Sequence, residues 1–292
     1  MSEAFDRLIQ RAEQLITRIE AVLPGPLSAP DWEASIAFRY RRRSNGHGVL
    51  EAVKHVAPLK LSELKEIDGQ REKIVRNTEQ FIKGLPANNV LLTGSRGTGK
   101  SSLVKACLNE FAPKGLRLIE IDKADVVDLP DIVELVGQRK EYFIVFCDDL
   151  SFEDGEAGYK ALKSILDGSV SAASPNVLIY ATSNRRHLLP EYMKDNLSYS
   201  HTDDGEVHPG EVIEEKISLS ERFGLWVSFY PFSQEEYLTI VMQWLRSLGL
   251  KGEALFEAAK AEELVWALER GSRSGRVAYQ FARDYVGRHE ST

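Results

Sequence analysis

Eight consecutive residues offer the chemistry of phosphate binding. Residues 94–101 read Gly-Ser-Arg-Gly-Thr-Gly-Lys-Ser, which fits the pattern G-x-x-x-x-G-K-[ST]. Glycines let backbone N–H groups curl around phosphates without a Cβ in the way. Lys100 can supply positive charge to the β- and γ-phosphates, and the Ser101 hydroxyl can bind Mg²⁺. The helix that begins here directs its positive end at the anion. We therefore expect a nucleoside triphosphate to be held by Gly94, Ser95, Arg96, Gly97, Thr98, Gly99, Lys100, Ser101 and Ser102.

Two adjacent carboxylates follow an apolar run. Residues 143–147 are Phe-Ile-Val-Phe-Cys, and Asp148 and Asp149 come directly after them. At the carboxyl edge of a parallel sheet, both side chains face the crevice that also holds the phosphate loop. Asp148 is placed to hold Mg²⁺, directly or through water, and Asp149 to orient and deprotonate the attacking water. Glu153, four residues further on, is a second candidate base.

The pattern of apolar segments predicts how these residues are positioned. Short strand candidates alternate with helical stretches. The apolar runs of the strand candidates are continuous, which is typical of strands covered on both faces. This pattern predicts an α/β sandwich with a parallel sheet. The five expected strands are 89–93, 116–122, 142–148, 176–182 and 225–229. After Pro231 only helical stretches follow, at 234–248, 252–270 and 274–288.

The N-terminal region is expected to be helical. Apolar residues recur at three- and four-residue steps from Phe5 to Val22, which predicts an amphipathic helix that Pro24 ends. A weaker helical stretch follows from about residue 31 into the arginine-rich residues 39–43, and 44–48 reads as a loop. The sequence thus predicts three parts: a helical N-terminal region (1–60), an α/β nucleotide-binding domain (61–231) and a helical lid (232–292).

Composition excludes several classes of protein. The 292 residues carry 37 Lys and Arg against 44 Asp and Glu, a net charge of −7, which argues against a surface that coats nucleic acid. The two cysteines, Cys107 and Cys147, rule out a disulfide scaffold and a cysteine-built zinc cage, and we expect both to be buried thiols. No apolar run reaches the roughly 18 residues of a membrane span, and the first residues do not follow a signal-peptide plan. We expect a soluble, cytoplasmic protein without a membrane partner.

Together these motifs resemble the AAA+ ATPases. The resemblance covers about residues 60–290. Within that superfamily a Glu is commoner at the position of Asp149, but bacterial replication initiators and helicase loaders carry the Asp-Asp pair. The stretches 89–102, 148–153 and 220–224, with Asn77 and Thr78, also look like a bacterial AAA+ family of unassigned cellular role. The resemblance implies a five-stranded parallel sheet sandwich with a C-terminal helical lid, and the cofactors ATP and Mg²⁺.

The resemblance assigns roles to two residues outside the phosphate loop and the aspartate pair. Asn184 follows the strand at 176–182, where the family keeps a polar residue that contacts the γ-phosphate or positions the water. Arg222, in the segment 218–224, matches the family's arginine finger, which reaches the γ-phosphate held by a neighbouring subunit; alternatively it pairs with Glu221 or Glu215 on the surface. A finger acting in trans implies a homo-oligomer, by family habit a ring or an open spiral.

Two further segments match the family at the nucleotide. Arg276, at the head of the last helix, fits the arginine that couples hydrolysis to lid motion, with Arg273 as second choice. Gly69 and Gln70 match the place where the family cradles adenine.

Several readings stay open. The run Arg39–Arg43, with Trp32, Phe38 and Tyr40 among its neighbours, either binds nucleic acid, which is not favoured, or pairs with an acidic surface. The loop 201–208 gathers metal-capable side chains, but its polar, glycine-containing sequence favours a hydrated surface insertion. As function, we expect either an oligomeric ATPase that remodels an unidentified protein partner or an ATP-controlled switch or loader for DNA-associated factors.

Overall fold

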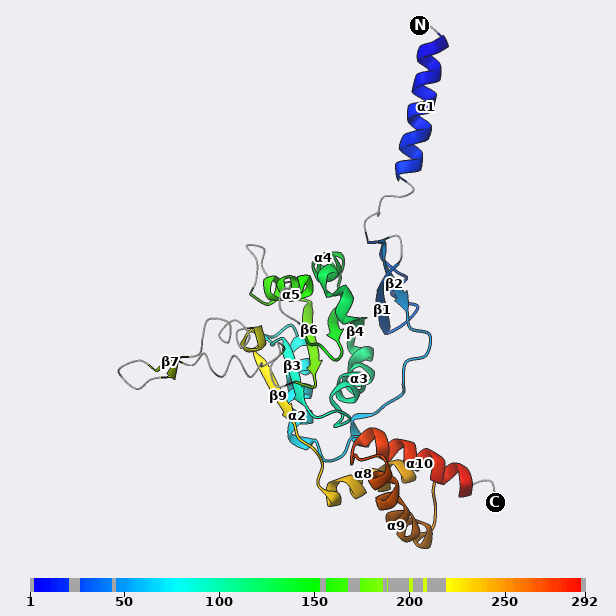
Figure 1. Cartoon of the computed structure of the whole chain (residues 1–292), viewed down its shortest axis with the longest axis vertical. Helices are drawn as coiled ribbons and strands as arrows, with labels where there is room; N and C mark the ends of the chain where they lie inside the picture. The colour runs from blue at the N-terminus through cyan, green and yellow to red at the C-terminus, as the bar shows by residue number, and fades with distance from the viewer. Residues whose placement is uncertain are drawn as a thin grey trace.

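The fold is known from a computed structural model that describes residues 3–20, 27–43, 46–152, 156–167, 174–185, 188, 200–201, 207–208 and 219–289 (Figure 1). The strands are β1 (Ala37–Arg42), β2 (Gly48–Ala52), β3 (Val90–Gly94), β4 (Leu116–Ile121), β5 (Tyr142–Cys147), β6 (Val177–Ser183), β7 (Ser200–His201), β8 (Val207–His208) and β9 (Leu225–Phe229). The α-helices are α1 (Glu3–Glu20), α2 (Asp68–Ile82), α3 (Lys100–Phe111), α4 (Leu129–Gly137), α5 (Ala157–Asp167), α8 (Gln234–Ser247), α9 (Glu253–Glu269) and α10 (Gly275–His289). Three 3-10 helices are η1 (Leu61–Glu63), η2 (Ala112–Lys114) and η3 (Lys123–Asp128).

A seven-stranded sheet with the order β2-β1-β4-β5-β6-β3-β9 organises the molecule. All neighbouring strands run parallel except β2, which pairs antiparallel with β1. The five expected strands are confirmed as β3, β4, β5, β6 and β9, and they form five consecutive places of the sheet. The strand count is larger than expected because β1 and β2 extend the edge beyond β4. β7 and β8 pair with each other in an antiparallel, two-stranded sheet.

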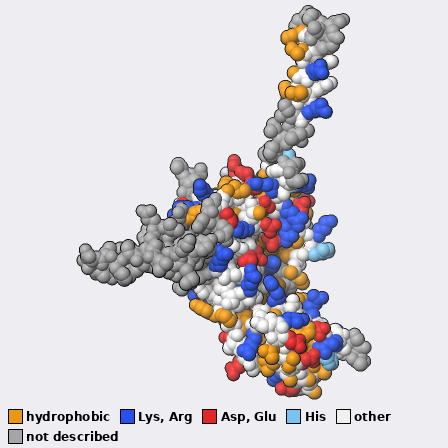
Figure 2. Space-filling view, in the orientation of Figure 1, with side chains coloured by type: hydrophobic (Ala, Val, Ile, Leu, Met, Phe, Trp, Pro, Cys, Tyr) orange, Lys and Arg blue, Asp and Glu red, His pale blue; other side chains and the backbone are white. Residues whose placement is uncertain are grey.

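The expected helix across residues 31–43 is wrong. The first part of this stretch, residues 31–36, holds a turn, and its second part contains β1, whose residues alternate: Phe38 and Tyr40 are buried, whereas Arg39 is half-buried and Arg41 exposed. A period of two residues belongs to a strand, and the short run of arginines concealed it. Helix α1, by contrast, is confirmed, and it stands away from the sheet (Figures 1 and 2). The three-part division of the chain remains a prediction, although β1 and β2 already belong to the main sheet.

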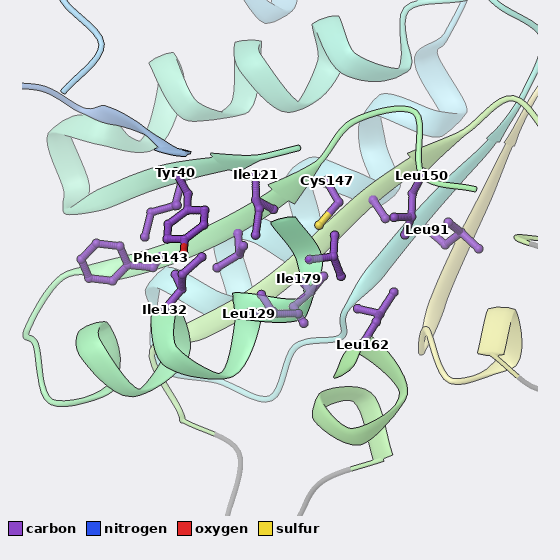
Figure 3. Close-up of a cluster of buried hydrophobic side chains, with 14 of the residues drawn as sticks. Tyr40, Leu91, Ile121, Leu129, Ile132, Phe143, Cys147, Leu150, Leu162 and Ile179 are labelled. Atoms are coloured by element: carbon purple, nitrogen blue, oxygen red, sulfur yellow. The ribbon is translucent and has the colours of Figure 1, made fainter. Parts of the chain in front are cut away.

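Helices cover both faces of the sheet. Successive residues of β5 point to opposite sides, so that Phe143 and Val145 join one buried cluster and Ile144 and Phe146 the other. The first cluster lies under α4 and α5 (Figure 3), and the second under α2 and α3. Cys107 and Cys147 are buried in these clusters as free thiols, as expected, and burial raises the pKa of each to about 12. The α/β sandwich is therefore confirmed.

The C-terminal helices α8, α9 and α10 form a small bundle with its own buried cluster, as the sequence predicts. Ser233 begins the bundle: its hydroxyl accepts from the Glu236 N–H, and the Glu236 carboxylate accepts from the Ser233 N–H. This reciprocal cap ends the extended chain after β9 and starts α8. The bundle thus follows directly on the strand that borders the phosphate loop.

Candidate functional site

The loop between β3 and α3 has a backbone that only its glycines permit. Gly94 has φ +121°, and a Cβ there would lie 1.9 Å from the Phe229 carbonyl oxygen of β9. Gly97 has φ +72°, and its Cβ would lie 2.7 Å from the Ser274 Cβ. Both contacts exclude a side chain, so the loop packs closely against β9 on one side and the head of α10 on the other. The loop is also braced internally, since the Thr98 hydroxyl donates to the Ser95 carbonyl over 2.8 Å.

Lys100 is held inside this loop. Its ammonium donates to the carbonyl oxygens of Gly94 and Ser95, each at 2.7 Å, and to Asn184 Oδ1 at 3.1 Å. The side chain is buried, and desolvation lowers its pKa, while the charges of Asp149 and Asp148 act in the opposite direction. A desolvated ammonium ringed by loop carbonyls is suited to a phosphate oxygen, which offers a full negative charge in place of partial ones. Ser102, next along α3 after Ser101, is half-buried.

Asp148 and Ser101 form an oxygen pair beside Lys100. The Ser101 hydroxyl donates to Asp148 Oδ1 over 2.6 Å, and the Thr182 hydroxyl donates to the same oxygen over 2.6 Å. Thr182 lies in the buried run of β6 and also accepts the Asp149 N–H at 2.9 Å. A hydroxyl and a carboxylate in contact are the hard oxygen ligands that Mg²⁺ uses together with nucleotide phosphates and water. The residues present therefore fit this ion.

Asp149 has an unusual backbone. Its φ of 53° lies in the left-handed region, which Asp tolerates better than most residues. Its carboxylate accepts from Asn184 Nδ2 and lies 3.7 Å from an Arg96 guanidinium nitrogen. The carboxylate thus faces Asn184 and Arg96 of the loop. Backbone strain of this kind, of order 1–3 kcal/mol, recurs at functional sites.

Arg96, Asp149 and Asn184 of this site also line a cavity. It has a volume of about 350 Å³ and is lined by Arg96, Asp149, Ser151, Asn184 and Arg185. Thus the structure brings together the loop, both aspartates and Asn184, as the sequence predicts. Sequence reasoning missed Thr182, Ser151 and Arg185. Arg185 directly follows Asn184, so its position in the chain was the available signal. Glu153, the second candidate base, lies outside the described residues.

The head of α10 docks on the loop. The Gly275 N–H donates to the Gly97 carbonyl oxygen over 2.7 Å, and the Ser274 hydroxyl accepts from the Val277 N–H in the first turn of α10. Arg276, which directly follows Gly275, is exposed. Its Cβ lies 3.7 Å from the position that a Cβ on Gly97 would take. Arg276 therefore starts beside the phosphate loop, and Arg273 is exposed just before it.

The start of α2 lies on the other side of the loop. The Gln70 amide donates to the Ser228 carbonyl of β9 over 3.2 Å, and space is open at the Gly69 Cα. Ile67 Cδ1 lies 3.5 Å from the position of a Cβ on Gly99. A buried network fixes this helix, because Asn77 Nδ2 and the Thr78 hydroxyl both bond the Tyr180 hydroxyl of β6, at 3.1 and 2.8 Å. Gly69 and Gln70 are thus close to the loop, next to β9.

Arg222 lies at the opposite edge of the sheet. It precedes β9, whose first residue Leu225 pairs with Val90, while the phosphate loop begins after Gly94 at the far end of β3. Five strand residues separate the two ends, roughly 15 Å. The Arg222 guanidinium bonds Asp167 at the end of α5 within the same chain. It therefore does not join its own chain's cavity, and Glu215, an expected alternative partner, lies outside the described residues.

The arginine-rich strand β1 is largely paired with acids. Arg39 bonds Glu120 at 2.6 Å, Arg42 bonds Asp128, and Arg43 lies 3.9 Å from Glu51. Its aromatic neighbours Trp32, Phe38 and Tyr40 are all buried in the core. The nucleic-acid interpretation assumed that these rings could stack on bases, and that geometry is wrong. Pairing with an acidic surface is confirmed, although the element is a strand rather than a helix.

Metal-binding clusters and membrane-spanning helices can be examined only in the described part of the chain. Residues 202–206 of the loop 201–208 lie outside the described residues. Among the residues that the structure does describe, no group of three or more His, Cys, Asp and Glu side chains is arranged to hold a metal by itself. Over the same residues, none of the helices has the length and apolar character needed to cross a membrane.

Comparison with known proteins adds a family and a fold. The family model described as "Protein of unknown function (DUF815)" matches residues 33–289. The replication factor C large subunit of Staphylothermus marinus is 28% identical over 117 residues, which are 37% of this chain and 27% of that protein. The match thus spans only about a quarter of that relative's length.

Solved structures resemble the chain more extensively. A variant of Thermotoga maritima RuvB superposes with a TM-score of 0.53 at 14% identity, covering 80% of this chain and 67% of that one. The FIGL-1 AAA domain in complex with ADP gives a TM-score of 0.50 at 16% identity, covering 78% and 73%. At such identities the likeness shows the fold alone.

Proposed function

This chain belongs to the DUF815 family and has the fold of the AAA+ ATPases, and we propose that it is a Mg²⁺-dependent ATPase that works as a homo-oligomer on a protein partner. The single observation that carries the proposal is the contact of Ser101 Oγ with Asp148 Oδ1 at 2.6 Å, directly beside the buried Lys100. The Lys100 ammonium and two oxygen groups that could hold a metal ion meet there at the start of α3. We also propose the cytoplasm as its location.

In the proposed binding mode, the glycine loop and α3 receive the triphosphate. Lys100 exchanges its bonds to the Gly94 and Ser95 carbonyls for the β- and γ-phosphates, and the α3 N-terminus adds its N–H groups. Ser101 and Asp148 would hold Mg²⁺, which neutralises charge on the phosphates when bound. Gly69 and Gln70 would bound the adenine side, since they lie against β9 next to the loop.

For hydrolysis we assign Asp149 as the base that orients the attacking water and accepts its proton. Asn184 touches both Asp149 and Lys100, so it links the base to the group that binds the γ-phosphate. Arg96, at 3.7 Å from Asp149, gives this carboxylate a positive neighbour at the edge of the cavity. Because Asp is one methylene shorter than Glu, slow turnover is expected.

Oligomerisation completes the site in this proposal. Arg222 lies at the sheet edge away from its own phosphate loop, and this position supports a role at the nucleotide of a neighbouring copy. In related phosphoryl transfers such an arginine contributes about 10³–10⁵ in rate. The Asp167 bond of Arg222 would then be exchanged for the phosphate. Arg276, next to Gly97, would couple the nucleotide to the lid.

A second function has its own support: an ATP-controlled switch or loader for DNA-associated factors. The Asp-Asp pair and the partial likeness to the replication factor C large subunit favour it. The two functions differ in turnover. An ATPase that remodels a partner hydrolyses ATP continuously and faster with that partner, whereas a switch holds ATP and hydrolyses it rarely.

The proposed site is tested by ATP binding to Lys100→Ala, measured by calorimetry with Mg²⁺. We expect affinity to fall at least about tenfold, because a charge-assisted bond to phosphate contributes about 1.5–3 kcal/mol. The control is Lys105→Ala, a half-buried lysine of the same helix, which should bind like wild type. Tight ATP binding by Lys100→Ala would overturn the site.

A further inference from the structure

Helix α1 carries an apolar face that is exposed to solvent. Leu8 is 65% exposed and Leu15 58%, and Phe5, Ile9 and Ile16 are exposed as well. The helix stands clear of the sheet and of the C-terminal helices (Figure 1), and apolar side chains are visible along it (Figure 2). Most of the stability of a helix in a protein comes from packing of its amphipathic face rather than from intrinsic propensity, so this 18-residue helix is stabilised mainly by what packs on its apolar face.

The spacing of this face is that of a coiled coil. Phe5, Leu8, Ala12 and Leu15 recur at steps of three, four and three residues, which are the a and d positions of a heptad. The next residue of the series in the sequence is Ile19. A strict average of 3.5 residues keeps one seam turned toward a partner helix over its whole length. Ile9 and Ile16, at the e positions, widen that seam.

The borders of the seam carry opposite charges. Arg11 and Arg18 occupy successive g positions on one border, and Glu13 occupies a b position on the other. The sequence places Asp6 and Glu20 at the neighbouring b positions. When identical helices run parallel, the g border of one helix, which carries the arginines, faces the acidic b border of the next helix. When they run antiparallel, like borders meet and the arginines repel each other. The charge pattern therefore complements a second copy of the same helix in parallel orientation.

We propose that α1 is a parallel coiled coil that joins copies of this chain. The proposal goes beyond the ATPase function and stands without it. Its consequence for that function is an effective concentration: tethered chains meet one another far more often than free ones, which favours the contact that brings Arg222 to a neighbour's nucleotide.

The molar mass of the nucleotide-free full-length protein, from light scattering after size exclusion, tests the proposal. We expect the wild type to be a multiple of 32.8 kDa and Leu8→Glu/Leu15→Glu to be a single chain. Gln10→Glu/Gln14→Glu adds the same charge on the opposite face and should keep the wild-type mass. A wild type of single-chain mass, or a Leu8→Glu/Leu15→Glu variant with the wild-type mass, would overturn it.

Two further variants test orientation and independence from ATP. Arg11→Glu/Arg18→Glu makes both borders acidic, so we expect loss of the assembled fraction at the concentration where wild type is half assembled. Adding Asp6→Arg/Glu13→Arg/Glu20→Arg restores opposite borders and should restore assembly. Unchanged assembly of Arg11→Glu/Arg18→Glu would contradict the parallel arrangement. Lys100→Ala should match the wild-type mass, so a failed ATP site and a failed coiled coil give different results.

Discussion

At the scale of single residues, the two aspartates after β5 have different surroundings, and the different roles proposed for them rest on this difference. Asp148 accepts from two hydroxyls, at 2.6 Å each, which leaves it suited to a cation. Asp149 adopts a left-handed backbone and faces Asn184 and the open cavity. The second position is therefore the one that a water molecule can reach.

The role proposed for Asp149 predicts the behaviour of Asp149→Asn. Asn tolerates φ of 53° as well as Asp does, so the fold should be kept. Without a base, the ATP turnover number should fall by about 10²–10⁴ while ATP still binds. Steady-state hydrolysis measures the turnover and calorimetry measures ATP binding. The control is Asp131→Asn, at an exposed residue of α4. Full activity in Asp149→Asn would point to another base.

Glu263 in α9 gives a prediction about pH. It is fully buried, neither carboxylate oxygen has a hydrogen-bond partner among the described residues, and burial raises its pKa from 4.5 to about 8. At a pH between 4.5 and about 8, Glu263 keeps its proton in the folded chain and releases it in the unfolded chain. The free energy of unfolding therefore falls as the pH rises toward 8. Glu263→Gln cannot ionise.

The expected result for Glu263→Gln is a gain in melting temperature over wild type that is small near about pH 5 and grows toward about pH 8, with a stabilisation of order 1–3 kcal/mol at the upper end. Thermal unfolding across this pH range measures it. A difference between the two proteins that does not change with pH would show that Glu263 does not titrate as described.

The sequence predicted the residues that we propose to touch phosphate better than those that position them. Lys100, Ser101, Asp148, Asp149 and Asn184 were expected and do lie together. Thr182 was missed because a threonine at the end of an apolar strand looks like an ordinary β-branched core residue. Its role depends on the pairing of β5 with β6, which no local pattern states.

At the scale of elements, the strand β1 changes what the N-terminal region is. Trp32 packs edge-on against Phe38 at 4.7 Å and Phe143 at 5.0 Å between ring centroids, so residues before 60 complete the sheet core. The five central strands were predictable because continuous apolar runs are long signals. β1 was not, since four arginines in five residues masked its alternation, and its acidic partners come from distant parts of the chain.

This architecture predicts that Phe38→Ala destabilises the protein by about 3–5 kcal/mol, because it empties a fully buried site. Phe5→Ala, on the exposed face of α1, is the matched control and should leave the unfolding of the sheet unchanged. Denaturant unfolding measures both. Similar midpoints for Phe38→Ala and wild type would show that β1 is dispensable.

At the scale of the whole molecule, three surfaces surround the proposed nucleotide site. The loop packs against β9, the head of α10 bonds Gly97, and the start of α2 lies beside Gly99. Arg222 alone among the expected site residues that the structure describes lies elsewhere, at the far edge of the sheet. In the proposed function, one chain alone is therefore an incomplete ATPase.

The measurement that tests this central claim most directly is Mg²⁺-dependent ATP hydrolysis per chain as protein concentration rises, for wild type, Arg222→Ala and Lys100→Ala. We predict that wild-type specific activity climbs with concentration, that Arg222→Ala stays low and flat, and that Lys100→Ala shows none. Wild-type activity that never exceeds that of Lys100→Ala would contradict the ATPase. Activity that is independent of both concentration and Arg222 would contradict a site completed by a neighbour.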